Sequence, residues 1–115
     1  MKIYTSYYGN IKNLPKNIIP ISISLYPPKD YKGLKCEQLY PTLTIWNNWK
    51  KNHDKEEYIK NYMKYLYTLN KNNILDKLNK KSKGKDICLI CYELPNDFCR
   101  RHYAGLWLDK ECKEI

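Results

Sequence analysis

The stretch Asp86-Ile87-Cys88-Leu89-Ile90-Cys91-Tyr92 decides the fold, because nearly all of its side chains are apolar. A strand of this kind is typical of the centre of a parallel sheet that is covered on both faces. Turn-forming residues follow at Pro95-Asn96-Asp97, and the pattern after them predicts a helix over about 99–110. We therefore expect a strand, a turn and a helix in succession, with the working site at the turn that spans residues 91–102.

Two further strands are predicted upstream of this unit, at 2–5 and 18–25, with a loose polar stretch at 6–10 between them. The second strand is rich in isoleucine and alternates from Ile21 onward. It is stopped by Tyr26-Pro27-Pro28, because proline cannot donate a backbone hydrogen bond to a neighbouring strand.

Three helices are predicted between residues 42 and 81, and each has a capping residue. Thr42 is expected to cap the first, Asp54 with Glu57 forms a capping box for the second, and Asn70 is expected to cap the third. Apolar residues recur at helical spacing in this region, and we attribute them to core packing. They are Ile45, Trp46, Trp49, Tyr58, Ile59, Tyr62, Met63, Leu66, Leu69, Ile74, Leu75 and Leu78.

The order of strands and helices predicts an α/β fold, a small Rossmann-like domain of three layers with a short, mainly parallel sheet. A chain of 115 residues has room for one core, so we expect a single domain over residues 1–115. The composition, 43% hydrophobic and 29% charged, is typical of a globular protein and excludes a disordered one.

The net charge of +9 favours anionic partners, namely nucleic acid, a phosphorylated small molecule or an acidic protein. The alternative, that the lysines only keep the surface soluble, stays open. No apolar run approaches the roughly 20 residues that a membrane span needs, and no signal peptide is visible, so we expect a cytoplasmic protein without membrane contact. An odd number of cysteines, five, fits reduced thiols better than a disulfide scaffold.

The spacing Cys88-x-x-Cys91 with Cys99-x-x-His102 resembles the two ligand pairs of a zinc site. The context argues against zinc, because residues three apart in a strand point to opposite faces of the sheet. We therefore predict neither a metal site nor a cofactor and interpret Cys88 as a core residue. A zinc site remains the third hypothesis for this region.

The ends of the predicted strands favour a ligand pocket, because open α/β sheets bind ligands at the carboxyl ends of their strands. The first residues of the following helix offer unpaired amides and two guanidinium groups to an anion. The predicted ligand-binding residues are Thr5, Ser6, Tyr7, Ser24, Pro27, Cys91, Arg100 and Arg101. The predicted catalytic residues are Glu93, Cys99 and His102. Glu93 is expected to act as a base or to orient a ribose hydroxyl, and Cys99 is the thiol activated by the helix start. His102 is interpreted as an acid or base, with a surface or hydrogen-bonded structural histidine as the alternative.

Two common phosphate-binding patterns are absent from the sequence. No cysteine is followed by an arginine at the Cys-x5-Arg spacing of a tyrosine-phosphatase loop, and no glycine-rich phosphate loop exists. If a nucleotide binds, side chains and a helix start must hold it.

Three short segments together resemble the domain-of-unknown-function 488 family. They are Ile3-Tyr4-Thr5, Ile21-Ser22-Ile23-Ser24 with Tyr26-Pro27-Pro28-Lys29, and Leu89-Ile90-Cys91-Tyr92-Glu93 with Phe98-Cys99-Arg100-Arg101-His102 and Trp107-Leu108. The resemblance implies a Rossmann-like domain of the kind found in phages and prokaryotic conflict, without a settled activity. The family's last motif is Cys-x-Glu followed by Cys-His-Arg.

The chain matches that last motif at Cys91, Glu93, Cys99 and Arg101. It departs from the motif at Arg100, which stands where the family has histidine; His102 lies two residues later. Many relatives also have an arginine in place of Leu25. These departures favour ligand binding over catalysis.

The sequence thus supports a pocket for a nucleotide-derived or other phosphorylated small molecule, in an enzyme or in a protein that sequesters a signalling nucleotide of a host defence system. The alternative is a basic nucleic-acid-binding module or an inhibitor of another protein. The sequence does not indicate the oligomeric state.

Overall fold

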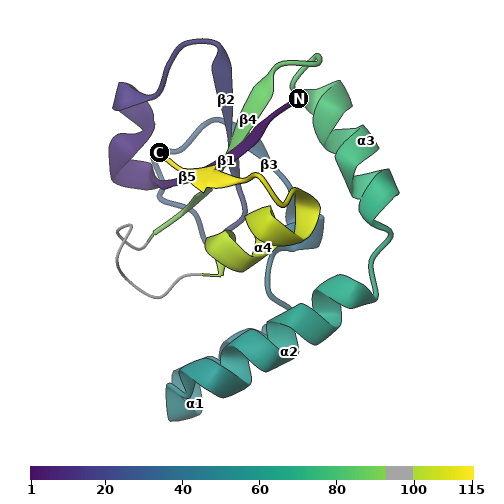
Figure 1. Cartoon of the computed structure of the whole chain (residues 1–115). Coiled ribbons are helices and arrows are strands. Elements are labelled where there is room, and N and C mark those ends of the chain that lie inside the picture. Colours follow the sequence, from purple (N-terminus) through teal and green to yellow (C-terminus); the bar gives the residue numbers. More distant parts are fainter. Residues whose placement is uncertain (93–99) are drawn as a thin grey trace.

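Five parallel strands form one sheet in the order β3-β2-β4-β1-β5 (Figure 1). The structure is a computed structural model, and it describes residues 1–92 and 100–115. The strands are β1 (Ile3–Tyr7), β2 (Ile18–Ser22), β3 (Leu34–Lys35), β4 (Asp86–Cys91) and β5 (Lys113–Glu114). This arrangement confirms the predicted small Rossmann-like α/β fold.

The central strand is β4, as its apolar sequence predicts. Residues 87–91 are all buried, and β4 pairs with β1 on one side and with β2 on the other. In this register Tyr7 lies beside Cys91 and Ser22 lies beside Ile90. The carboxyl ends of the three middle strands therefore meet at one edge of the sheet.

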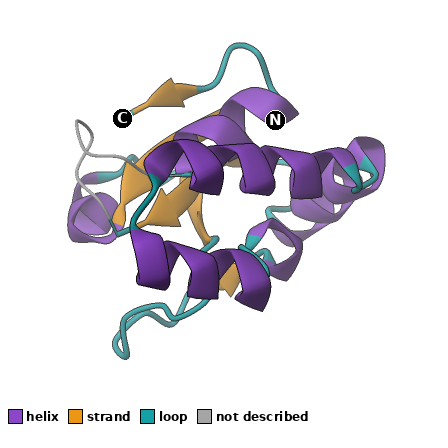
Figure 2. Ribbon diagram, turned by 90° about the horizontal axis from the view of Figure 1, so that it is seen from below, coloured by secondary structure: helices purple, strands orange, loops and turns teal. Residues whose placement is uncertain are grey.

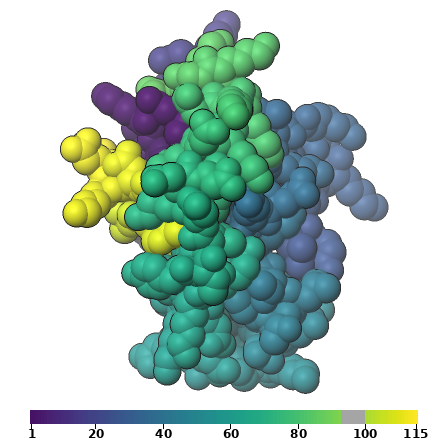
Figure 3. Space-filling model, turned by 90° about the vertical axis from the view of Figure 1, so that its right-hand side faces the viewer, coloured from purple at the N-terminus to yellow at the C-terminus, as the bar shows by residue number. Residues whose placement is uncertain are grey.

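Four α-helices are described: α1 (Leu43–Asn52), α2 (Lys55–Tyr67), α3 (Lys71–Lys81) and α4 (Arg101–Leu108). Figure 2 shows the helices packed around the strands, with β5 at the margin of the sheet. Viewed from the side, α2 and α3 separate the C-terminal segment from the residues around β3 (Figure 3). Within the described part of the chain, no helix is long and apolar enough to cross a membrane.

The three predicted helix caps are confirmed. Thr42, Asp54 and Asn70 each accept a hydrogen bond from the backbone amide three residues later, at 3.2, 3.1 and 3.0 Å. The second half of the predicted capping box differs, because Glu57 accepts from Asn52 Nδ2 at 3.0 Å instead of from the Asp54 amide. That amide donates to Asn52 Oδ1 instead. Asn52 therefore donates to the Glu57 carboxylate and accepts from the Asp54 amide.

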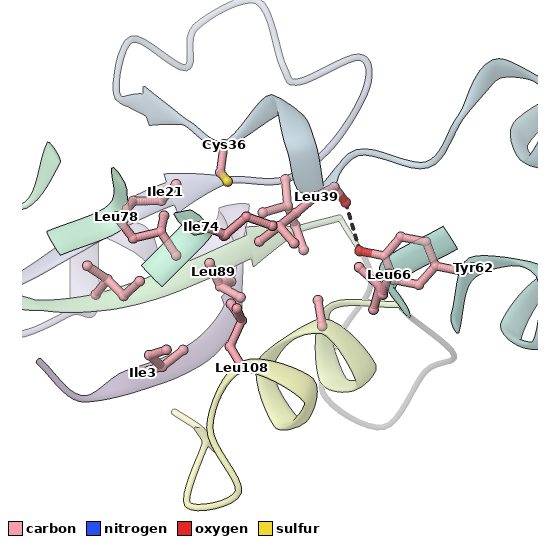
Figure 4. Close-up of a cluster of buried hydrophobic side chains, with 13 residues drawn as sticks. Ile3, Ile21, Cys36, Leu39, Tyr62, Leu66, Ile74, Leu78, Leu89 and Leu108 are labelled. Atoms are coloured by element: carbon pink, nitrogen blue, oxygen red, sulfur yellow. Dashed lines mark hydrogen bonds between the residues drawn. The ribbon is translucent and has the colours of Figure 1, made fainter. Parts of the chain in front are cut away.

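The main core lies between the sheet and α2, α3 and α4. It contains Tyr62, Leu66, Ile74 and Leu78 of the predicted helical stripes, packed against isoleucines and leucines of β1, β2 and β4. Tyr62 is fully buried in this core, and its hydroxyl donates to the Leu39 carbonyl at 2.7 Å (Figure 4). The stripes thus serve packing, as expected.

The second face of the sheet has a thinner cover. Its buried cluster is Ile18, Cys88 and Ile90, and the partly buried residues packed on it are Tyr4, Tyr8, Ile11 and Leu14. The covering element is η1 (Tyr8–Asn13), a 3-10 helix. The prediction of a loose polar stretch at 6–10 was wrong, because β1 continues to Tyr7 and η1 follows at once.

Candidate functional site

Three predicted ligand-binding residues come together at the carboxyl edge of the sheet: Ser24, Cys91 and Arg100. The Ser24 hydroxyl donates to Cys91 Sγ at 3.5 Å, and Arg100 Nη1 donates to the same sulfur at 3.3 Å. Arg100 Nη2 also donates to the Ile23 carbonyl. All three side chains are buried, and Arg100 is only 7% exposed. A positive charge is therefore held in place beside a thiol and a hydroxyl.

A small pocket of about 110 Å³ opens beside these residues, and we call it the strand-end pocket. Besides Ser24, Cys91 and Arg100 it is lined by Leu25, Tyr26, Pro41, Trp46 and Tyr92. Two of these lining residues are linked, because the Tyr92 hydroxyl donates to the Tyr26 carbonyl. The pocket is thus apolar except for the groups contributed by Ser24, Cys91 and Arg100.

Tyr8 also belongs to this edge, although it is not among the residues predicted from the sequence. Its hydroxyl shares a hydrogen bond of 2.5 Å with Ser22 Oγ, and its ring packs edge-on against Tyr92 at a centroid distance of 4.8 Å. The pKa of Tyr8 is raised, and burial is the main cause. The hydrogen bonds with Ser22 and Ser24 and the charge of Arg100 lower the pKa, but by less. Tyr8 is therefore a neutral phenol. Its place at the end of β1 is the only signal that could have indicated it.

A second polar cluster forms around Glu114 in β5, and we call it the Glu114 cluster. Arg101 donates to both carboxylate oxygens, from Nε at 3.1 Å and from Nη2 at 2.9 Å. The Thr5 hydroxyl donates to Oε1 at 2.5 Å, and His102 Nε2 lies 3.2 Å from the same oxygen. Burial alone would raise the pKa of Glu114, but the hydrogen bonds from Arg101 and Thr5 and the charges of Arg101 and His102 lower it below its ordinary value.

The side chain of Arg101 lies away from the strand-end pocket and from that of Arg100. Both guanidinium groups were expected at the turn, but Arg101 is fully buried against the Glu114 carboxylate, so its charge is already matched by an acid. The reason is helix geometry, since consecutive side chains of a helix diverge by about 100°. Arg100 therefore points toward β2 and β4, whereas Arg101 points toward β5.

The remaining predicted residues do not join the strand-end pocket. Ser6 is buried and donates to the Ile115 carbonyl at 2.9 Å, so it holds the last residue of the chain. Tyr7 is half-buried, and Pro27 borders a different hollow beside β3. Glu93 and Cys99 lie outside the described residues, so their predicted roles stay predictions.

The spacing that resembles a zinc site spans two faces of the sheet. Cys88 packs with Ile18 and Ile90 on the second face, whereas Cys91 contacts Ser24 and Arg100. Burial raises the pKa of the Cys88 thiol to about 12, so it stays protonated near neutral pH. Within residues 1–92 and 100–115, no group of three or more His, Cys, Asp or Glu side chains is placed to hold a metal ion.

A protein-family model matches most of the chain. The model of the DUF488-N3a family, described as the active DUF488-N3 subclade, matches residues 3–112. Neither the curated proteins nor the solved structures contain a significant match. Because the family model covers nearly the whole chain, including β1, β4 and α4, the resemblance noted in the sequence is confirmed: the chain belongs to the DUF488-N3a family.

Proposed function

We propose that the chain binds a phosphorylated small molecule, nucleotide-derived or other, at the strand-end pocket. The observation that carries this proposal is the placement of Arg100, whose buried guanidinium lies beside Cys91 and Ser24 on the wall of that pocket. Guanidinium is the side chain best suited to phosphate recognition, because it is always charged and offers several donors in a fixed plane.

The size of the pocket limits which part of the ligand it holds. Pockets that enclose a whole small molecule usually measure about 300–1,000 Å³, whereas the strand-end pocket measures about 110 Å³. It therefore accommodates one group of the ligand, and the phosphoryl group is the part that Arg100 would hold. The remainder of the ligand extends out of the pocket, past the exposed side chains of Tyr26 and Tyr92.

We further propose that the chain converts this ligand and does not only sequester it. The description of its family as an active subclade supports this choice. The candidate reacting groups are Cys91, beside Arg100, and the predicted Glu93 and Cys99, whereas His102 lies in the Glu114 cluster. The thiol of Cys91 is a candidate nucleophile, because cysteine forms covalent intermediates in many group-transfer enzymes.

Calorimetry with nucleoside mono-, di- and triphosphates and inorganic phosphate tests the binding proposal. Hydrogen bonds to charged groups contribute about 1.5–3 kcal/mol, so Arg100→Met should weaken binding by roughly 10- to 100-fold. Lys64→Met is the matched control, because it removes one positive charge from an exposed position on α2. Binding by Arg100→Met that equals binding by Lys64→Met, or no binding by the wild type, would refute the proposal.

A second variant guards against misfolding of Arg100→Met. Trp46→Leu changes the pocket wall without removing the guanidinium, and it should also weaken binding if the ligand occupies the strand-end pocket. Circular dichroism establishes that each variant is folded. For turnover, chromatography of the ligand after incubation should reveal product with the wild type and none with Cys91→Ser or Arg100→Met. If the wild type also leaves the ligand unchanged, the protein only sequesters it, and the proposal of catalysis is refuted.

A further inference from the structure

A groove of about 480 Å³ lies on the second face of the sheet, and we call it the second-face groove. One wall comes from η1, with Tyr8, Ile11 and Lys12, and the opposite wall comes from the residues before β3, with Pro28 and Tyr31. Pro20 of β2 also borders it. Its volume lies within the range of about 300–1,000 Å³ that is usual for ligand sites.

The groove exists because this part of the sheet lacks a covering α-helix. Parallel neighbours are usually joined through a helix that packs on the sheet, but residues 23–33 join β2 to β3 without one. The prolines at 27 and 28 prevent helix continuation there, so this connection forms a wall of irregular structure. That wall and η1 together line the groove, and their Tyr31 and Tyr8 rings meet in it.

Two tyrosine rings in the groove are fixed in place. The Tyr8 hydroxyl is bound to Ser22 Oγ at 2.5 Å, and the Tyr31 hydroxyl donates to the Leu34 carbonyl at 2.5 Å. The two rings meet edge to face, with centroids 5.5 Å apart. Burial raises the pKa of Tyr31 to about 12, so this wall is a neutral aromatic surface. A preorganised aromatic surface binds a planar ring with little loss of side-chain entropy.

The rim of the groove is strongly basic. Lys12 and Lys32 line it together with one acid, Asp30. A neighbouring hollow of about 470 Å³ shares Lys32 with the groove and adds Lys29 and Lys35. All four lysines are exposed, and they line the groove and the hollow that adjoins it.

We propose that the second-face groove binds single-stranded nucleic acid, with a base against the tyrosine rings and the phosphates along the four lysines. Aromatic rings beside a basic track are the usual elements of such sites, because every base has a face that can stack. An acidic peptide would use the lysines but not the rings, and a duplex keeps its bases stacked inside. This site goes beyond the strand-end pocket and does not depend on Arg100.

Fluorescence anisotropy with a labelled 12-mer of deoxythymidine tests the site. If the four lysines each neutralise one phosphate, the slope of log K against log salt should be about −2.8, which is about a 50-fold loss of affinity between 50 and 200 mM salt. The double variant Lys12→Gln/Lys32→Gln should reduce the magnitude of this slope by about 1.4. The matched control is Lys60→Gln/Lys64→Gln, which removes the same charge from exposed positions on α2.

Variants of Tyr31 separate stacking from charge. Base stacking on an aromatic side chain contributes about 1–3 kcal/mol, so Tyr31→Leu should weaken binding by roughly 5-fold or more. Tyr31→Phe keeps the ring but loses its hydrogen bond to the Leu34 carbonyl, so it should bind more tightly than Tyr31→Leu, provided that circular dichroism confirms a folded protein. The lysine variants carry no folding risk, since their side chains are exposed.

Four outcomes would overturn the proposal: no binding to the 12-mer at low salt, equal binding by the groove and control lysine variants, equal binding to a duplex, or equal binding to a poly-glutamate peptide of similar length. Arg100→Met should leave binding of the 12-mer unchanged. Because the function proposed above requires the opposite result for a phosphorylated small molecule, failure of one proposal is distinguishable from failure of the other.

Discussion

Replacement of Glu114 by glutamine is expected to destabilise the whole fold, although residue 114 is next to the end of the chain. The change keeps the shape of the side chain and removes its charge. Arg101 is fully buried and would lose the carboxylate that accepts its two hydrogen bonds. Thr5 in β1 and His102 in α4 would lose the same partner, so the change affects the contact between β5, β1 and α4.

The expected cost follows from the burial of the pair. Loss of one partner of a fully buried ion pair costs about 3–5 kcal/mol. The side chain of Glu114 is 21% exposed, so water can partly replace it, and glutamine still offers one oxygen as an acceptor. We therefore expect a loss of about 2–3 kcal/mol, out of the roughly 5–15 kcal/mol that stabilises a typical domain.

Urea denaturation followed by circular dichroism at neutral pH measures this loss. With a typical urea dependence, 2–3 kcal/mol corresponds to a midpoint lowered by about 1–2 M. Glu111→Gln is the matched control, since it makes the same change at an exposed position. A Glu114→Gln midpoint within about 0.2 M of that control would refute the role given to the Glu114 cluster.

The pH dependence gives a second readout with a defined sign. The pKa of Glu114 is lowered in the folded state from its ordinary value of 4.5, so the charged form stabilises the fold above that pH and this contribution is lost as the pH falls through the lowered pKa. The difference in free energy of unfolding between wild type and Glu114→Gln should therefore be largest near neutral pH and should disappear in acid. A gap that stays constant from neutral pH into acid would contradict the pairing.

Three further predictions concern packing and thiol reactivity. Gly105→Ala should lower the free energy of unfolding by about 1–3 kcal/mol in urea denaturation, despite the better helix propensity of alanine. The reason is that the new Cβ would lie 2.5 Å from Cys112 Sγ and 2.9 Å from Thr5 Cγ2. A variant as stable as the wild type or more stable would refute this close approach of α4 and β1. Tyr62→Phe should cost about 1–2 kcal/mol, since it leaves the Leu39 carbonyl without the hydroxyl donor, whereas Tyr67→Phe, at a position 72% exposed, should cost nothing measurable. Cys88 should resist iodoacetamide at pH 8 in the native state and react only on unfolding, as mapped by mass spectrometry, because burial raises its pKa to about 12; rapid native labelling would contradict this burial.

Much of the fold was predictable because its determinants are local. The apolar run at 86–92 could be only a central strand, and the caps at Thr42, Asp54 and Asn70 act on amides three residues away. Periodicity likewise identified the buried side of α2 and α3. The short strands β3 and β5 were missed because two residues carry no periodic pattern, and only their parallel neighbours identify them as strands.

The site was predictable only in part, because its partners are remote in sequence. Position at a strand end selected Ser24 and Cys91, and position at the helix start selected Arg100; the topology brings these three residues together. The pairing of Arg101 with Glu114 could not be foreseen without β5, since the register of that strand places Glu114 beside Thr5. The sequence indicated two adjacent arginines, but only the direction of α4 separates their roles.

Tyr8 connects the two proposed sites. Its ring packs against Tyr92, which lines the strand-end pocket, and against Tyr31, which lines the second-face groove. The hydroxyl of Tyr8 is fixed on Ser22 at the end of β2, so the ring cannot move toward one site without changing its contacts at the other. If both sites bind as proposed, a ligand that shifts Tyr8 in one of them must change affinity in the other by the same factor in either direction. Binding of a phosphorylated small molecule and binding of single-stranded nucleic acid would then be coupled through the Tyr8 side chain, although Tyr8 lies in a stretch that was predicted to be a loose polar segment without a function.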